Sequence, residues 1–222
     1  TGSIGIPCPG TEVRVEEDGE LSFRGDNIMK GYYKNPEANA EVFDGDWFKT
    51  GDLGRIDGEG YIHITGRKKE IYVLSGGKNV APLVVEETMK SIPVISQVFL
   101  VGDGRKFCSA LVTLDVGVIL RDNLGMNPDK VPRDPMEQIE ELEKRGHKLS
   151  DFVESEEVRS DIESQISELN KRFMNPEQIK KFTILPRDLN IDSGELTPTL
   201  KIRRKQIREN WADEIEAMYS GA

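Results

Sequence analysis

The pattern of apolar residues changes part way along the chain, and this change constrains the fold more than any other sequence feature. In the first part, apolar and polar residues alternate in short runs at 12–15 and 20–24, separated by Asp18-Gly19. Alternation around a glycine-containing turn predicts an antiparallel hairpin. A second hairpin is expected around Asp57-Gly58-Glu59-Gly60. Between the two hairpins, Asn35 is expected to cap a short helix that has Pro36 at its first position. Residues 1–66 are therefore expected to form a small antiparallel sheet or partial barrel.

Helical and strand signals are mixed in the remainder of the chain. Within residues 137–174, apolar residues recur at the 3.6-residue period of an amphipathic helix. The overall order predicts an α+β fold, in which residues 67–222 form a sheet flanked by helices with a helical insertion at about 116–171. The domain boundary is expected at the basic segment 66–69. The expected strands are 70–74, 95–102, 109–115 and 179–185, and the expected helices include one at 82–89 and a terminal one at 202–218.

Composition excludes several classes of protein. The 222 residues are 36% hydrophobic and 32% charged, which is typical of a globular protein, and the net charge of −10 argues against nucleic-acid binding. Cys8 and Cys108 lack the spacing of a disulfide framework or a metal site, so a reducing, cytoplasmic compartment is expected. No apolar run approaches the length of a membrane helix. Because Thr1-Gly2-Ser3 leads directly into a strand-like segment, we expect an excised fragment.

Three clusters are candidates for chemistry, at residues 47–53, at 66–70 followed by 75–82, and at 194–204. Each also has a simple structural explanation: an ordinary turn at Thr50-Gly51-Asp52, a flexible hairpin tip at Gly76-Gly77, and a solvated helix face at 201–205. Together they favour a nucleotide or acyl-phosphate site.

The residue types suit that chemistry. The carboxylate of Asp52 offers two acceptor oxygens to a ribose diol, and the guanidinium of Arg67 offers a fixed fork of donors. Lys201 offers a compact cation for an oxyanion whose charge grows in a transition state. Gly76 and Gly77 allow the backbone to approach a ligand closely.

The order of these motifs resembles the adenylate-forming superfamily of acyl-CoA synthetases, adenylation domains and luciferases. Residues 19–38 are similar to that family's GEL…G…M.GYY..PEAT segment, Thr50-Gly51-Asp52-Leu53 to its TGDL motif, and Gly66-Arg67-Lys68-Lys69-Glu70 to its hinge motif. Residues 196–201 are similar to the motif with the catalytic lysine. The Thr-Pro-Thr-Leu-Lys form and the long insertion resemble long-chain fatty acid–CoA ligases. The resemblance covers nearly the whole chain.

The resemblance implies a role for each candidate residue. Asp52 would bind the ribose hydroxyls of ATP, Arg67 would contact the same nucleotide, and Lys201 would be the catalytic lysine of adenylation. Lys69, where the family usually has Asp, would be the hinge. Gly76-Gly77-Lys78 would line the coenzyme A path. Residues 1–66 would then be the last subdomain of the large adenylating domain, and 67–222 the lid domain.

The implied reaction converts a fatty acid, ATP and CoA to acyl-CoA, AMP and pyrophosphate through an acyl-adenylate. Mg²⁺ would accompany ATP, with its ligands outside this chain, and no metal site is expected within it. The phosphate loop and YG.TE motif lie upstream in the family and are not found here, so this chain alone is expected to be inactive. Weak membrane association of the parent enzyme and its oligomeric state are left open.

Two other functions remain open from sequence. One is the lid portion of another adenylating enzyme, of the aryl, bile-acid or peptide-synthetase type, because the acid pocket lies outside this chain. The other is a non-catalytic interaction module that retains the fold. The upstream sequence of the parent gene distinguishes them, since a phosphate loop followed by a YG.TE-like motif favours an enzyme.

Overall fold

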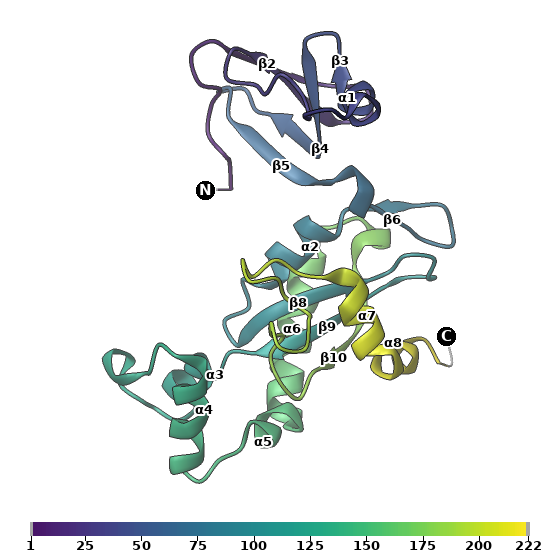
Figure 1. Cartoon of the computed structure of the whole chain (residues 1–222). Helices are drawn as coiled ribbons and strands as arrows, with labels where there is room; N and C mark the ends of the chain where they lie inside the picture. The colour runs from purple at the N-terminus through teal and green to yellow at the C-terminus, as the bar shows by residue number, and fades with distance from the viewer. Residues whose placement is uncertain (1, 221–222) are drawn as a thin grey trace. The chain divides into compact units, whose positions relative to one another are not determined.

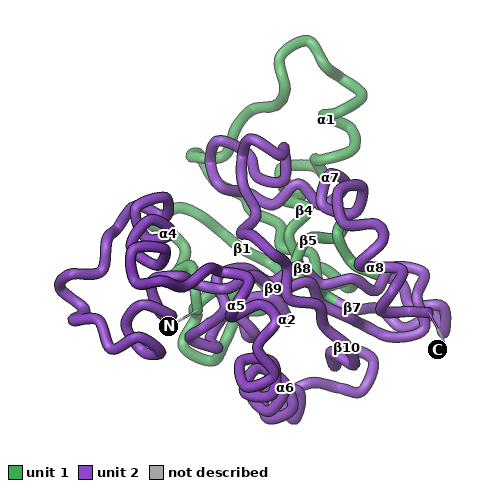
Figure 2. The backbone as a smooth tube through the Cα atoms, turned by 90° about the horizontal axis from the view of Figure 1, so that it is seen from below, with its two compact units in different colours: residues 1–72, 81–84 green, residues 73–80, 85–222 purple. Residues whose placement is uncertain are grey.

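The expected hairpins are present in the computed structural model, which describes residues 2–220. The chain divides into two compact units, which are described separately below (Figure 2). Unit 1 comprises residues 1–72 and 81–84, and unit 2 comprises residues 73–80 and 85–222.

Unit 1 is a curled antiparallel sheet of five strands. Strand order is β1-β2-β4-β3, and β5 pairs with the far part of the long strand β4 (Figure 1). The strands of unit 1 are β1 (Thr11–Val15), β2 (Glu20–Gly25), β3 (Phe43–Asp44), β4 (Trp47–Ile56) and β5 (Ile62–Arg67).

One short helix, α1 (Pro36–Val42), precedes β3. Its start follows the sequence prediction: the side chain of Asn35 accepts a hydrogen bond from the N–H of Ala38, and Pro36 occupies the first turn, where no intrahelical donor is needed. The 3₁₀ turn η1 (Lys68–Glu70) follows β5.

A short ribbon follows η1, made of β6 (Tyr72–Val73) and β7 (Asn79–Val80). The strand expected at 70–74 is thus shortened, because η1 takes up its first residue. Helix α2 (Pro82–Met89) begins at a proline, as expected, and its residues from Val85 onward belong to unit 2.

The sheet of unit 2 has the order β10-β9-β8. The neighbours β8 (Ile95–Val101) and β9 (Cys108–Leu114) are antiparallel, whereas β10 (Ile179–Ile184) runs parallel to β9. Every residue of β9 is buried, as befits a central strand. Helix α6 covers one face of the sheet, and α7 and α8 cover the other (Figures 1 and 2).

The helical insertion between β9 and β10 confirms the expectation for 116–171, although it is broken into short pieces. It comprises α3 (Val116–Val118), the π-helical turn η2 (Ile119–Asn123), η3 (Pro128–Lys130), α4 (Pro135–Lys144), α5 (Leu149–Val153) and α6 (Glu156–Asn170), followed by the 3₁₀ turn η4 (Asn175–Glu177). On α6, Val158, Ile162 and Ile166 are buried at helical spacing.

The terminal helix expected at 202–218 is two helices, α7 (Arg204–Asn210) and α8 (Ala212–Tyr219). They meet at Trp211, whose backbone leaves the helical region with φ −117° and ψ 31°. The hydrophobic core on this side of the sheet contains Phe99, Val101, Leu111, Leu185, Leu189, Leu196, Ile207, Trp211, Ile215 and Met218. The prediction of an α+β fold is confirmed, with an antiparallel sheet in unit 1 and a mixed sheet with helices in unit 2.

Candidate functional site

The segment Thr50-Gly51-Asp52 forms an irregular bulge in β4. Leu53 pairs with Glu20 and Lys49 pairs with Ser22, so three residues of β4 face the single residue between those partners on β2. Gly51 has φ +74°, a conformation that glycine adopts without strain. The bulge re-aims the side chains that follow it, which is a common arrangement beside a binding site.

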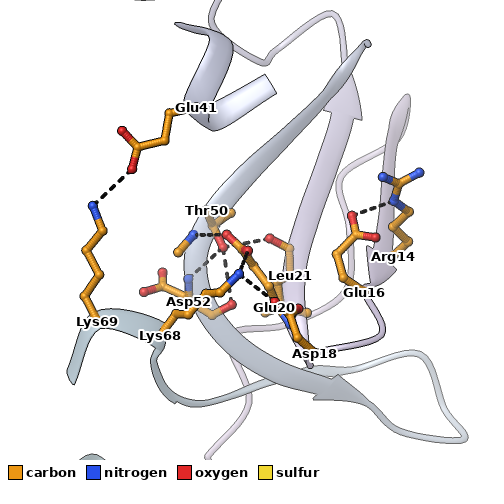
Figure 3. Close-up of polar contacts among 11 residues, drawn as sticks. Arg14, Glu16, Asp18, Glu20, Leu21, Glu41, Thr50, Asp52, Lys68 and Lys69 are labelled. Carbon is orange, nitrogen blue, oxygen red and sulfur yellow. Dashed lines mark hydrogen bonds and ion pairs between the residues drawn. The ribbon is translucent and has the colours of Figure 1, made fainter. Parts of the chain in front are cut away.

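Hydrogen bonds fix the shape of this bulge. The Thr50 hydroxyl donates to the carbonyl of Leu21 over 2.8 Å and accepts from the N–H of Asp52 over 3.0 Å. The buried carboxylate of Glu20 accepts from the N–H of Gly51 over 2.8 Å (Figure 3). The N–H groups of Gly51 and Asp52 are therefore satisfied from within unit 1, which holds Asp52 in place.

Glu20 is held in turn by Lys68. The ammonium of Lys68 lies 3.0 Å from a Glu20 carboxylate oxygen and 2.5 Å from one of Asp18 (Figure 3). The hydrogen bond from Lys68 lowers the pKa of Asp18, and the hydrogen bonds to Asp18 and Glu20 raise the pKa of Lys68. Sequence reasoning placed Lys68 only in the hinge motif and did not single out Glu20.

Asp52 and Arg67 are brought together by strand pairing. They are directly opposite each other on β4 and β5, and the Arg67 Nε lies 3.1 Å from the Asp52 Oδ1. Their side chains are 26% and 61% exposed, so the pair faces solvent and can reach a ligand. Within residues 2–220, the second oxygen of the Asp52 carboxylate has no recorded partner, which leaves it free to accept a hydrogen bond.

Strand β4 passes very close to β2 and β5 at Gly54. A Cβ on Gly54 would lie 2.6 Å from the carbonyl oxygen of His63 and 2.6 Å from a methyl carbon of Leu21. Only glycine fits this crossing, so the residue after the TGDL motif has a packing role. His63 itself contacts Asp57 over 2.8 Å, a carboxylate partner that sequence reasoning did not find.

Lys69, the expected hinge residue, lies in the turn η1. Its side chain is 88% exposed, and its ammonium is 3.4 Å from a carboxylate oxygen of Glu41 (Figure 3). An exposed pair of this kind contributes little stability, so it leaves the side chain free to change partners.

Gly76, Gly77 and Lys78 lie in the exposed tip between β6 and β7. A Cβ on either glycine would meet no atom within 4 Å, so neither glycine is required by packing inside the chain. Gly77 has φ +72°, and its N–H donates to the carbonyl of Leu74 over 2.8 Å. The tip is a tight turn with an accessible backbone, and Lys78 adds a cation beside it.

Lys201 ends a compact turn in unit 2. The N–H of Lys201 donates to the Thr197 hydroxyl over 3.0 Å, and the N–H of Thr197 donates to the carbonyl of Lys201 over 2.9 Å. Leu200, within this turn, has φ +59°, an uncommon conformation for a residue with a side chain. In the described part of the chain no partner is recorded for the Lys201 ammonium, and the residue is exposed.

Two buried carboxylates near this turn were not found by sequence reasoning. Glu195 is 0% exposed and Glu86 is 3% exposed, and each makes a bidentate pair with an arginine: Arg187 in the first case and Arg204 in the second. A signal for Glu86 exists, because it lies three residues before the buried Met89 on α2 and therefore shares its helical face. No comparable signal marks Glu195.

Within residues 2–220, no group of three or more His, Cys, Asp or Glu side chains lies close enough to bind a metal ion. The same residues contain no helix with the length and apolar character that a membrane span requires. Cys8 and Cys108 are both free thiols.

Comparisons with known proteins fit this geometry. A family model described as "AMP-binding enzyme C-terminal domain" matches residues 69–151 and 139–222. The chain is 40% identical over 99% of its length to a protein of Mycobacterium tuberculosis named long-chain-fatty-acid--CoA ligase FadD15. It is 36% identical over 98% of its length to human long-chain-fatty-acid--CoA ligase ACSBG1. The chain spans 34% and 31% of these two relatives.

Solved structures share the fold. The adenylation domain of a carboxylic acid reductase from Segniliparus rugosus, solved with AMP and a carboxylic acid, matches 97% of this chain and 32% of that one, with a TM-score of 0.66 and 23% identity. O-succinylbenzoate coenzyme A synthetase from Bacillus subtilis, solved with ATP and magnesium, matches 93% of this chain and 36% of that one, with a TM-score of 0.57 and 25% identity. The chain therefore belongs to the family of AMP-binding enzyme C-terminal domains.

Proposed function

We propose that this chain is the C-terminal part of an ATP-dependent long-chain fatty acid–CoA ligase. The parent enzyme would join a fatty acid to ATP as an acyl-adenylate with release of pyrophosphate, and would then transfer the acyl group to the thiol of CoA with release of AMP. The observation that carries this proposal is the 40% identity, over 99% of the chain, to a protein named as such a ligase.

Asp52 and Arg67 are the proposed nucleotide-binding residues. The free oxygen of the Asp52 carboxylate suits a ribose hydroxyl, which needs an acceptor, and Arg67 at 3.1 Å supplies donors beside it. The hydrogen-bonded bulge from Thr50 to Asp52 keeps the acceptor oriented before the ligand arrives. Preorientation of this kind lowers the entropy lost on binding.

Lys201 is the proposed catalytic residue of adenylation. An exposed ammonium with no recorded partner in residues 2–220 is available to a developing anion, here the carboxylate and α-phosphate of the reacting pair. The chemistry needs positioning and charge stabilisation more than covalent work by the protein.

The remaining assignments concern the movement between half-reactions. Residues 1–66 would complete the large adenylating domain, and residues 67–222 would form a lid that turns about Lys69. Gly76-Gly77-Lys78 would line the path of the CoA pantetheine, which suits a tip whose glycines have open space around them. A backbone hinge of few residues suffices for such a rotation.

ATP, Mg²⁺, a fatty acid and CoA are the proposed ligands of the parent enzyme. Asp52 and Arg67 fit the ribose side of ATP, whereas the Mg²⁺ ligands are assigned to upstream residues. The cytoplasm is the proposed compartment, and the 222-residue chain alone is expected to be inactive.

The test is a comparison of half-reactions in the full-length parent. Pyrophosphate release with a long-chain fatty acid measures adenylation, and acyl-CoA formation from supplied acyl-adenylate measures thioester formation. Lys201→Ala should abolish most of the first activity and spare the second. Lys205→Ala is the matched control, since Lys205 is 92% exposed and close in sequence. Equal loss in both half-reactions would contradict the role of Lys201, and pyrophosphate release only with a different class of acid would contradict the substrate.

A further inference from the structure

The segment that carries Lys201 is held at each end by a buried carboxylate that is paired with an arginine. We propose that Glu195 and Glu86 are positioning residues. They hold the loop 195–204 (the Lys201 loop) in one conformation, so that the ammonium of Lys201 is correctly placed against the adenylate. The inference rests on the proposed function and names residues that neither the motifs nor the comparisons assign.

Glu195 is the anchor at the start of the Lys201 loop. Its two carboxylate oxygens accept from both terminal nitrogens of Arg187 over 2.7 and 2.8 Å, from the Trp211 indole over 2.8 Å, from the Asn210 amide over 3.1 Å and from the N–H of Asn190 over 3.2 Å. Burial by itself raises the pKa of Glu195, but the hydrogen bonds from Arg187, Asn210 and Asn190 and the charge of Arg187 lower it below its ordinary value. The carboxylate therefore stays charged at neutral pH.

The two ends of the Lys201 loop are joined by backbone contacts next to this anchor. The N–H of Arg203 donates to the backbone carbonyl of Glu195 over 2.8 Å, and Leu196 and Ile202 form an antiparallel bridge. Their side chains pack against the core of unit 2, where Leu196 is buried. The loop is thus closed by backbone hydrogen bonds and by the packing of Leu196 and Ile202 against the core.

Glu86 is the anchor at the end of the Lys201 loop. It lies on α2, and its carboxylate binds the guanidinium of Arg204 through two bonds of 2.8 and 2.7 Å. It also accepts from the N–H of Leu100 on β8 over 2.8 Å, and the guanidinium of Arg204 lies 5.5 Å from the ring centroid of Phe99. The residue that opens α7 is therefore fixed to both α2 and β8.

The two anchors restrict the conformation of the Lys201 loop more than they stabilise the fold. A buried ion pair contributes little net stability compared with apolar packing, because both charges lose their hydration, but its directional bonds allow only one arrangement. Lys201 needs that restriction because its own side chain is long, exposed and without a recorded partner in the described chain. A misplacement of about 1 Å is enough to cost about 100-fold in rate.

The test uses Glu195→Gln in the full-length parent, which keeps the shape of the side chain and removes its charge. We expect adenylation to fall about 10- to 100-fold while thioester formation from supplied acyl-adenylate stays within about twofold. Hydrogen exchange should be faster in the peptide covering 195–203 and unchanged in β9. Glu141→Gln is the matched control, because Glu141 pairs with Arg145 over 2.9 Å on α4, away from the Lys201 loop.

The outcomes separate the explanations. A merely structural role lowers both half-reactions equally, because it only reduces the fraction of folded enzyme, and that result would overturn the inference. Unchanged adenylation with unchanged exchange would overturn it as well. If Glu195→Gln does not fold, Arg187→Met serves instead, since Arg187 is 38% exposed and its loss leaves Glu195 three other donors. Failure of wild-type adenylation with any fatty acid would instead refute the proposed function.

Discussion

The ion pair between Glu86 and Arg204 allows a quantitative test of the packing in unit 2. The side chains of Glu86 and Arg204 are 4% and 17% exposed, so removing Glu86 takes a bidentate acceptor away from a largely buried guanidinium. Breaking a buried pair in this way costs about 3–5 kcal/mol. Glu86→Ala also removes the 2.8 Å hydrogen bond between the N–H of Leu100 and the Glu86 carboxylate, so we expect a loss near the top of that range.

Two further variants make the test specific. Glu209→Ala breaks the exposed pair of Lys205 and Glu209, whose charged atoms are 3.8 Å apart, and should cost less than about 1 kcal/mol. The double variant Glu86→Leu with Arg204→Met replaces both charges by apolar groups and should recover most of the lost stability.

Urea unfolding followed by tryptophan fluorescence measures these differences. A Trp47→Phe background leaves Trp211 as the reporter, which lies in the core of unit 2. With a urea dependence of about 2 kcal/mol per molar, Glu86→Ala should lower the midpoint by about 2 M. A shift as small as that of Glu209→Ala, or a double variant no better than Glu86→Ala, would refute the buried pair.

Three more predictions follow from the structure. Burial raises the pKa of Cys108 to about 11, so this thiol stays protonated at pH 8. A thiol reagent should therefore modify only Cys8 in the native chain and both cysteines in urea. Rapid modification of both cysteines in the native chain would contradict the burial of Cys108. In the parent enzyme, Asp52→Asn should weaken ATP binding about 10- to 100-fold, as expected for a hydrogen bond to a charged acceptor, and an unchanged Kd from calorimetry would exclude the assigned role. Lys69→Pro should fix φ and trap one lid orientation, and thioester formation at the normal rate would show that Lys69 is not the hinge.

Local sequence patterns predicted most elements of the fold. Alternation predicted β1 and β2, the sequence Asn35-Pro36 predicted the start of α1, and Pro82 predicted the start of α2. These elements depend on local chemistry, namely turn residues, caps and periodicity, which is present in the sequence itself.

The misplaced elements depend on tertiary contacts. The terminal helix breaks at Trp211, whose indole donates to the buried Glu195 over 2.8 Å, and no helical pattern reveals a contact to a residue so far back in the chain. The strand expected at 70–74 is reduced because η1 forms immediately before it. At Trp211, a tertiary contact overrides the local helical preference.

The candidate site was also predicted only in part from the sequence. Asp52 and Arg67 were predicted from their motifs, and strand pairing brings them within 3.1 Å. The residues that hold the site were missed: Glu20 under the bulge, and Glu86 and Glu195 around the Lys201 loop. Each is a charged residue that is buried because its partners are distant in sequence. Composition and periodicity alone predict that such a residue is exposed to solvent.

The central claim is that the carboxylate of Asp52 and the ammonium of Lys201 serve one adenylate. Its most direct test is a crystal structure of the intact parent enzyme with a non-hydrolysable acyl-adenylate analogue. We expect Asp52 within hydrogen-bond distance of the ribose hydroxyls, and the Lys201 Nζ within hydrogen-bond distance of the oxygens around the acyl-phosphate linkage. An analogue bound with its ribose away from Asp52, or a parent enzyme in which no lid orientation brings Lys201 to that nucleotide, would contradict the account.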